Sequence, residues 1–548
     1  MRVALPVLAL LLSFALLPAP ATAEEAPRRL LPRPADAQAE SAPPERRPPA
    51  IRSRPVAAPS LATVGLGEAR SGFEGPLWPG AEADRLRALL DRLPERLALP
   101  ALHDLARRLL TAPGPRVEDG LALLLARARV LARIGDPALA AELLLTPGDA
   151  ESRAPRQKAA LAALAAAREA AKACELAAGM PGEEVAPAAV RIVCALREGN
   201  ADLAGLRLEL ARERGLAFAP DFLAMLDAAR SGRPLSVTLP TGDARPAMLL
   251  LIGELPVGEA AVEGELGADP AVLAVLAGNA RAPAAIRLLA AEAAAAAGWL
   301  EAGDLRRVYL EAAEPGQEAA AAKRAAMVAR LAAETVPAAR AALLAEAVPA
   351  LAAGIERLLW LRVLAPDAAM LVPDPALDWA AEAVILPLLA AGESERIEEW
   401  RLLLERRVRA TGEGGAELGR IERLLALAGR RPLPEPAPLP GDRQRLLFAT
   451  LADGLGLSLE RREWTRLLGR ETAGAAQAPP LSLWRQLGDA QAEGRPGEGL
   501  LAALGLLTDA PEGAAPLALW RVLRGLGALG EEEVARAMAV QLALVWRL

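Results

Sequence analysis

The chain has 548 residues, a formal net charge of −6, and 53% hydrophobic but only 3% aromatic residues. Its length leaves room for several domains. However, 5 Phe, 1 Tyr and 9 Trp are too few for several aromatic-rich β cores, and the abundant Ala, Leu, Arg and Glu favour helices. The negative charge argues against nucleic-acid binding, which depends on neutralising phosphates with cationic side chains.

The first 23 residues have the pattern of an export signal. A basic start at Met1-Arg2 precedes an apolar run from Val3 to Leu17, and Ala21-Thr22-Ala23 provides a small-x-small cleavage site. The apolar run is shorter than the roughly 20 residues that a membrane-spanning helix needs. We therefore expect 1–23 to be a cleaved signal peptide, and the mature chain from Glu24 to be periplasmic or secreted, without a stable membrane span. An uncleaved membrane anchor is the alternative.

Residues 24–80 are rich in proline and show no helical periodicity, as in Leu31-Pro32-Arg33-Pro34. Such a composition is typical of a disordered linker. It would serve either as a tether or as a solubilising leader. Phe73, Leu77 and Trp78 lie near the end of the segment, and we expect these apolar side chains to pin it onto the first helix.

From residue 81 onward the pattern is helical. Apolar residues recur with the spacing of a helix that buries one face, at Leu86, Leu89, Leu90, Leu93, and at Leu102, Leu105, Leu109, Leu110. Asp136-Pro137 and Asp374-Pro375 each place an acidic cap before a proline at the first helical position. Leu235 to Pro240 is the one alternating strand candidate, and we interpret it as an extended connection. The fold class is therefore predicted to be all-α.

One kind of turn recurs along the chain. A helix ends at glycine, a polar residue follows, and an amphipathic helix then begins, with the glycines at Gly135, Gly199, Gly303, Gly392 and Gly530. Glycine adopts the left-handed backbone that ends a helix, and the polar side chain caps the next one. These turns predict stacked antiparallel helical hairpins. Their spacing is irregular, so no strict repeat period holds.

Through these Gly-polar turns and the alanines that let helices approach, the chain resembles the tetratricopeptide-like (TPR-like) class of helical repeats from about Asp84 to Leu548. The class has a period of about 34 residues with recurring Trp, Tyr and Pro, whereas Tyr309 is the only tyrosine here. The resemblance implies a degenerate, irregular α-solenoid. The chain also looks like uncharacterised exported proteobacterial helical proteins, some with an automatic antifreeze-type label, although it has no regular threonine array to match an ice lattice.

A proline-rich segment interrupts the helical region. Arg431 to Pro440 alternates prolines with other residues and cannot continue a helix. We therefore expect a helical repeat domain at 81–429, a linker at 430–441 and a C-terminal helical domain at 442–548, which is long enough to bury a core. Tryptophans beside leucines in this last domain are expected to have a packing role, whereas an exposed one lining a groove would indicate a binding surface: Trp464, Trp484, Trp520 and Trp546.

Residues suited to catalysis are few or isolated. His103 is the only histidine, so we interpret it as a solvated or capped helix residue rather than a metal ligand or catalytic base. Glu398-Glu399 and Glu531-Glu532-Glu533 fit solvated helix starts or faces better than a glycosidase pair. Gly412-Glu413-Gly414-Gly415 has neither the strand nor the lysine of a phosphate-binding loop. The sequence thus predicts no catalytic residue, no metal ligand and no cofactor-binding residue.

Cys174 and Cys194 are the only cysteines, and an exported chain would carry them into an oxidising compartment. We expect one helix from about 155 to 178 and another from about 187, joined by the turn from Gly179 to Glu184, so that the two thiols meet. A structural disulfide at this spacing would stabilise the fold by roughly 3 kcal/mol. A redox-active pair is the alternative, but the C-x-x-C spacing is absent.

These features together predict an exported, noncatalytic helical-repeat scaffold that mediates interactions between proteins of the bacterial cell envelope. The signal, the linker, the helical array and the missing active-site motifs motivate this prediction. Two alternatives stay open. One is a murein-processing enzyme or accessory protein with a superhelical domain, and the other is a structural or stress-protective envelope protein without a fixed partner.

Overall fold

A computed structural model describes residues 61–67, 71–73, 75–237, 239–258, 269–313, 319–393, 395–434, 439, 441–459, 461–468, 480–507 and 513–548. The chain divides into two units, Met1–Ala57 and Ala58–Leu548, and every described residue belongs to the second unit. The expected signal peptide at 1–23 and the expected linker up to residue 60 lie outside the described residues.

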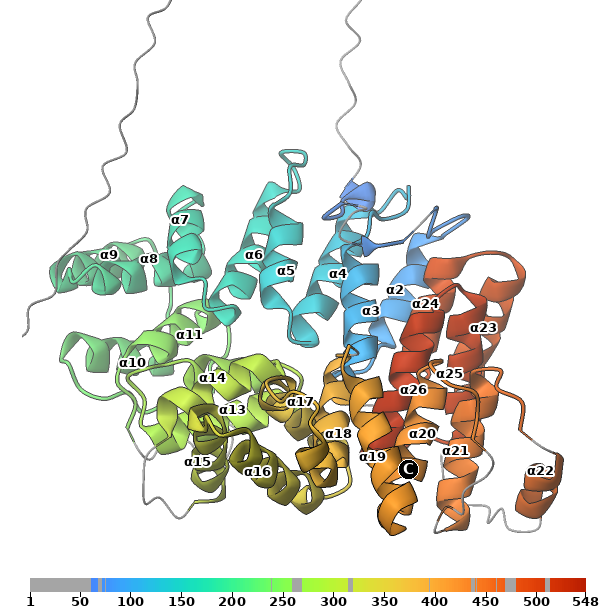
Figure 1. Cartoon of the computed structure of the whole chain (residues 1–548). Helices are drawn as coiled ribbons and strands as arrows, with labels where there is room; N and C mark the ends of the chain where they lie inside the picture. The colour runs from blue at the N-terminus through green and yellow to red at the C-terminus, as the bar shows by residue number, and fades with distance from the viewer. Residues whose placement is uncertain are drawn as a thin grey trace, which may run out of the picture. The chain divides into compact units, whose positions relative to one another are not determined.

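Throughout its described part the chain is all-α, as predicted, and short turns join many of the successive helices (Figure 1). The first helices are η1 (Leu61–Thr63), α2 (Ala83–Asp91), α3 (Pro100–Thr111), α4 (Gly120–Arg133), α5 (Pro137–Leu145), α6 (Arg153–Ala166), α7 (Ala170–Gly179), α8 (Val185–Arg197), α9 (Ala201–Glu213), α10 (Pro220–Arg230), α11 (Arg245–Glu254), α12 (Pro270–Ala277) and α13 (Ala284–Ala296). They are followed by α14 (Ala302–Ala312), α15 (Ala320–Ala333), α16 (Pro337–Ala350), α17 (Ile355–Ala369), η4 (Pro375–Ala380), α18 (Ala381–Ala391), α19 (Ile397–Thr411), α20 (Gly415–Leu427), α21 (Asp442–Gly454), α22 (Arg461–Leu468), α23 (Leu481–Ala492), α24 (Pro496–Gly505), α25 (Pro516–Ala528) and α26 (Glu532–Trp546).

Neighbouring helices in sequence are mostly neighbours in space. Close pairs include α4 with α5, α8 with α9, α12 with α13 and α17 with α18. Helices far apart in the sequence also contact one another. α24 packs against α2 and α3, and α26 packs against α3, α17 and α20 (Figure 1). The helices after the proline-rich segment thus contact both the first helices and the middle ones. A domain boundary at 430–441 stays a prediction.

The predicted turns are present at most of the expected glycines. Four of them have positive φ angles, as the left-handed helix end requires: Gly135 (+105°), Gly199 (+76°), Gly392 (+78°) and Gly530 (+86°). The prediction is wrong for Gly303, which lies in the first turn of α14, and Gly298 (φ +81°) follows α13 instead. Of the two acidic caps, Asp374 accepts a hydrogen bond from the Ala376 N–H, whereas the Asp136 side chain makes no capping bond at α5.

Residues 61–80, which the composition assigns to the linker, pack against the helices at several described positions. Leu77 is buried, and its carbonyl accepts a hydrogen bond of 2.8 Å from the Gly497 N–H at the start of α24. Trp78 Nε1 donates to the Pro113 carbonyl at 2.9 Å, just after α3. A few apolar anchors therefore hold a segment whose average composition resembles a linker. They attach it to α24 and to the end of α3, not only to the first helix.

A buried arginine closes the C-terminal end of α3. Arg127 of α4 is only 3% exposed, and its Nε and Nη1 donate to the Leu110 and Val64 carbonyls at 2.9 and 2.8 Å. Its Nη2 donates to the carbonyls of Leu110 and Ala112. The last carbonyls of a helix have no intrahelical partner. The planar guanidinium satisfies several of them at once because it carries five N–H donors.

The same arrangement recurs in other helix pairs. In each, an arginine near the start of a helix donates to a carbonyl at the end of the helix before it: Arg156 on α6, Arg287 on α13, Arg340 on α16 and Arg357 on α17. Each of these arginines is at least nine-tenths buried. These hydrogen bonds join the end of one helix to the start of the next. They therefore help to set the angle between the two helices and also cap the first one.

Candidate functional site

Cys174 and Cys194 form a disulfide with Cα atoms 5.8 Å apart, which confirms the predicted pairing. The bond links α7 to α8. The predicted continuous helix from 155 to 178 is wrong, because α6 and α7 are separate helices. Arg168 lies between them and adopts the left-handed backbone with a φ of +63°. Glycine is the usual residue at such a position, so the sequence did not indicate that the helix breaks here. The disulfide therefore joins two short helices.

His103 lies on α3 and contacts the end of α4. Its Nε2 is 3.1 Å from the carbonyl of Ile134, the residue that follows the last turn of α4. A carbonyl only accepts hydrogen bonds, so Nε2 carries the proton and caps this helix end. Nε2 is also 3.1 Å from Asp136 Oδ2, but that oxygen makes no hydrogen bond of good geometry. His103 is thus a largely buried helix residue that caps a neighbouring helix.

Arginines pair with both acidic runs. Glu398 forms ion pairs with Arg401 at 2.8 Å and Arg431 at 2.9 Å, while Glu531 pairs with Arg108 at 2.6 Å. Hydrogen bonding from Arg401 lowers the pKa of the Glu398 carboxyl, and the charges of Arg401 and Arg431 add to this shift. Among the residues that the structure describes, no group of His, Cys, Asp and Glu side chains is arranged to hold a metal ion.

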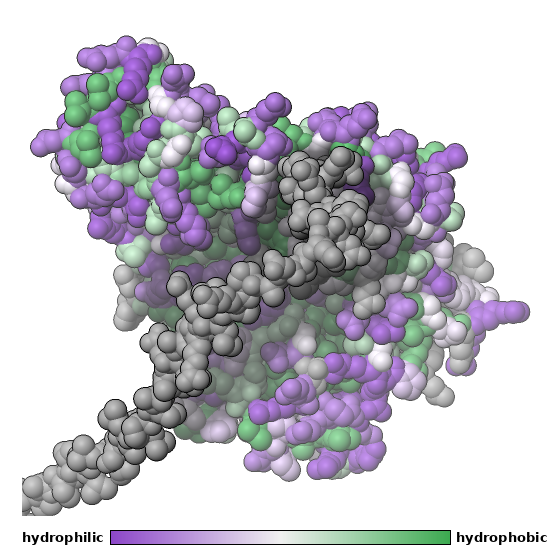
Figure 2. All heavy atoms as spheres, turned by 90° about the horizontal axis from the view of Figure 1, so that it is seen from above, coloured by the Kyte–Doolittle hydropathy of each residue, from purple (hydrophilic) through white to green (hydrophobic). Residues whose placement is uncertain are grey.

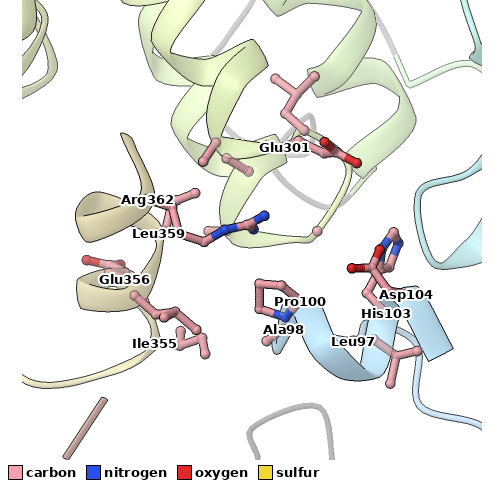
Figure 3. A pocket seen from close by; sticks show the side chains of 16 residues that line it. Leu97, Ala98, Pro100, His103, Asp104, Glu301, Ile355, Glu356, Leu359 and Arg362 are labelled. Carbon is pink, nitrogen blue, oxygen red and sulfur yellow. The ribbon is translucent and has the colours of Figure 1, made fainter. Parts of the chain in front are cut away.

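A small cavity of about 80 Å³, with a mostly apolar lining and a few charged side chains, lies beside α3, α14 and α17 (Figure 3). In Figure 3 the Arg362 side chain extends from α17 toward the side on which Glu301 and Asp104 lie. Burial lowers the pKa of Arg362, and the two acidic groups oppose this shift. A water molecule takes up about 30 Å³ of liquid volume. The cavity therefore suits a few water molecules and is too small for a sugar ring.

A larger groove runs along one face of α6 and has a volume of about 540 Å³. The face of α6 that lines it carries residues at helical spacing: Pro155, Lys158, Ala159, Ala162, Ala163 and Ala166. Side chains of α4, α5, α11 and α12, together with Trp299, complete the lining. We call this site the α6 groove. The face drawn in Figure 2 has apolar residues between hydrophilic ones.

The α6 groove has an apolar lining and a cationic rim. Leu125 and Leu249 line it from α4 and α11, and the alanines of α6 leave space between them. Its charged lining residues are all cations: Arg129, Lys158 and Arg245. Lys158 and Arg245 pair with carboxylates, whereas exposed Arg129 makes no hydrogen bond or ion pair with a described residue. The groove therefore offers one free positive charge beside an apolar surface.

Trp299 is held in place at one end of the α6 groove. Its Nε1 donates to the Arg133 carbonyl at 3.2 Å. The turn at Gly298, just before Trp299, packs closely on the turn at Gly135, since a Cβ atom at Gly135 would lie 2.4 Å from the Gly298 carbonyl oxygen. A side chain at Gly135 would push these two turns apart. Gly135 therefore allows the close approach of the turn that precedes Trp299.

The sequence singled out none of the residues of the α6 groove. Alanine is common along the whole sequence, so an alanine face on α6 gave no distinct signal. Arg129 and Lys158 also look like ordinary solvated residues in the sequence. Only the fold brings them beside Trp299, which lies more than a hundred residues further along the chain.

The fold defines the chain as an all-helical protein with an apolar groove. No described helix is both long and apolar enough to cross a membrane. The chain matches no known family model, no curated protein and no solved structure.

Proposed function

We propose that the helices form an irregular, TPR-like α-solenoid of antiparallel hairpins, and that the protein is an exported, noncatalytic scaffold binding other proteins of the cell envelope. The contacts between successive helices and the repeated arginine caps support the solenoid. The signal pattern at 1–23 supports export, and the Cys174–Cys194 disulfide is compatible with an oxidising compartment. The α6 groove is the observation that carries the binding role.

The partner segment that fits the α6 groove best is an amphipathic helix with acidic residues along one edge. The volume of the α6 groove, about 540 Å³, lies within the range of roughly 300–1,000 Å³ that is common for binding sites. Small residues on α6 allow a second helix to approach closely, and helices commonly dock by laying an apolar face into such a groove. The free charge of Arg129 would then favour a carboxylate on the partner.

Site-specific photo-crosslinking tests this function. A photoreactive amino acid replaces Ala162, an exposed residue in the α6 groove, or Ala178, an exposed alanine on α7 outside it. Irradiated envelope fractions are then analysed by mass spectrometry. We expect the same partner protein to be crosslinked reproducibly through position 162 and not through position 178.

A blocking variant provides the second arm of the test. Ala162→Arg places a bulky cation in the groove, and Ala178→Arg is its matched control. Both positions are exposed and tolerate a long side chain, so both variants should fold. We expect only Ala162→Arg to abolish the capture of that partner, because only this arginine lies in the groove. Equal capture by both variants, or no reproducible partner for the unmodified protein, would contradict the proposed function.

A further inference from the structure

A second cleft lies among the C-terminal helices, on the other side of the proline-rich segment. It has a volume of about 640 Å³ and is lined by residues from the end of α21 and from α23, α25 and α26. Arg521 and Arg524 stand one helical turn apart on α25 and both face it. We call this site the Arg–Trp cleft.

Each of the two arginines stacks on a tryptophan. The Arg521 guanidinium lies 5.4 Å from the ring centroid of Trp484, and that of Arg524 lies 5.8 Å from the ring centroid of Trp520. Trp520 is itself fixed, since its Nε1 donates to Asp453 Oδ2 at 2.6 Å. Stacking on an aromatic face holds a guanidinium in one orientation while its edge stays available to hydrogen-bond acceptors.

The two arginines have donors that nothing in the described part of the chain uses. Neither forms an ion pair or a hydrogen bond with a described residue, and Arg521 Nε is buried without a partner. Buried N–H donors nearly always have an acceptor in folded proteins. Arg536 adds a third cation to the lining, where Glu532, 4.0 Å away, is the one carboxylate. The cleft therefore presents oriented, unused donors to an incoming anion.

We propose that the Arg–Trp cleft binds an acidic segment of a partner protein, with its side-chain carboxylates accepting hydrogen bonds from Arg521 and Arg524. A guanidinium edge matches the two oxygens of a carboxylate. Leu455 and Leu523 also line the cleft and offer contacts to apolar side chains of the same segment. The proposal does not depend on the α6 groove, because the two sites share no residue.

Two features favour a peptide over other anions. The cleft volume of about 640 Å³ far exceeds what a single inorganic ion fills. Nucleic-acid bases would need free aromatic faces for stacking, but an arginine of the protein itself lies over each tryptophan.

Fluorescence anisotropy tests the proposal with two labelled peptides, one of alternating Glu and Leu and one of alternating Gln and Leu. We expect the full-length protein to bind the Glu peptide and to bind the Gln peptide much more weakly. The Arg521→Gln/Arg524→Gln variant should bind the Glu peptide about tenfold to a hundredfold more weakly, because hydrogen bonds to charged groups are lost. Added salt should weaken the binding of the unmodified protein.

Controls separate a binding site from a general charge effect. Arg233→Gln removes an exposed arginine elsewhere, and Ala162→Arg blocks only the α6 groove, so both should bind the Glu peptide as the unmodified protein does. If circular dichroism finds the double variant unfolded, exposed Arg524→Gln alone serves, with a smaller loss expected. Three results would overturn the proposal: no binding of the Glu peptide, equal binding of the Gln peptide, or tighter, arginine-dependent binding of a single-stranded oligonucleotide.

Discussion

Two regions of the molecule bury arginine in different ways. Between α3 and α4, Arg127 donates only to backbone carbonyls. Between α14 and α17, Arg306 forms a two-pronged pair with the fully buried Asp367, with Nη1 2.6 Å from Oδ2 and Nη2 3.0 Å from Oδ1. The first region holds a net positive charge, which the carbonyl dipoles at the end of α3 stabilise. The second holds a neutral pair.

The two regions differ in whether a substitution can remove the hydrogen-bond acceptors of the buried arginine. The pair of Arg306 and Asp367 consists of two side chains, so substitution can remove both together. The acceptors of Arg127 belong to the backbone, and no substitution takes them away. Burial lowers the pKa of Arg127 to about 10, yet the group remains charged at neutral pH. We therefore expect the arginine caps to be the less replaceable of the two arrangements.

Arg127→Ala should give the largest effect. The substitution leaves buried carbonyls at the end of α3 without donors and opens a cavity, so the free energy of unfolding should fall by about 5 kcal/mol. Denaturant unfolding followed by circular dichroism measures this loss. Arg129→Ala on the same helix is the matched control, and it should change stability by less than about 0.5 kcal/mol because Arg129 is exposed. A loss below about 1 kcal/mol at Arg127 would show that the cap is dispensable.

Asp367→Ala should give the next largest loss in the free energy of unfolding. It leaves the Arg306 guanidinium buried with only the Val363 carbonyl as acceptor, which should cost about 4 kcal/mol in the same unfolding assay. The double variant Arg306→Met/Asp367→Leu should recover to within about 1 kcal/mol of the unmodified protein, since an apolar pair of similar size can replace a buried ion pair. A double variant as unstable as the single one would remove the distinction between the two regions.

The sequence predicted the all-α class because its signals are local. Leucine spacing, proline at helix starts and glycine at helix ends each depend on a few neighbouring residues, and Leu86, Leu89 and Leu102 are buried as predicted. The break between α6 and α7 was missed because Arg168 takes a conformation that glycine usually signals. Buried arginines were also missed. In a sequence they look like surface residues, and only their position near a helix start hints at a capping role, as in Pro337-Ala338-Ala339-Arg340.

Binding surfaces were predicted less well than the fold. The disulfide between Cys174 and Cys194 could be predicted from the sequence because two cysteines allow only one pairing. Both grooves, by contrast, depend on which helices pack side by side. Trp484 and Trp520 were predicted to pack beside leucines, and Trp484 does pack against the hydrophobic core. Both tryptophans are half-buried, each beneath an arginine that lines the Arg–Trp cleft and that sequence reasoning did not single out.

The smallest expected effect concerns Arg401, which represents a third way of burying an arginine. Its side chain is 3% exposed, but its acceptor Glu398 is 52% exposed. The hydrogen bond from Arg401 lowers the pKa of Glu398 below its ordinary value. The interaction therefore stabilises the folded state above the pKa of an unfolded glutamate, and this contribution disappears as the pH falls through the lower pKa of the folded state.

Glu398→Gln should accordingly flatten the acid side of the stability profile. The unmodified protein should lose more free energy of unfolding than the variant between neutral pH and about pH 3, by less than about 1 kcal/mol because solvent screens the carboxylate. Denaturant titrations at several pH values measure the difference, which should shrink in about 1 M salt. A variant that loses as much stability in acid as the unmodified protein would mean that Glu398 does not stabilise Arg401. The buried guanidinium would then depend on its other acceptors, Glu405 and Glu422.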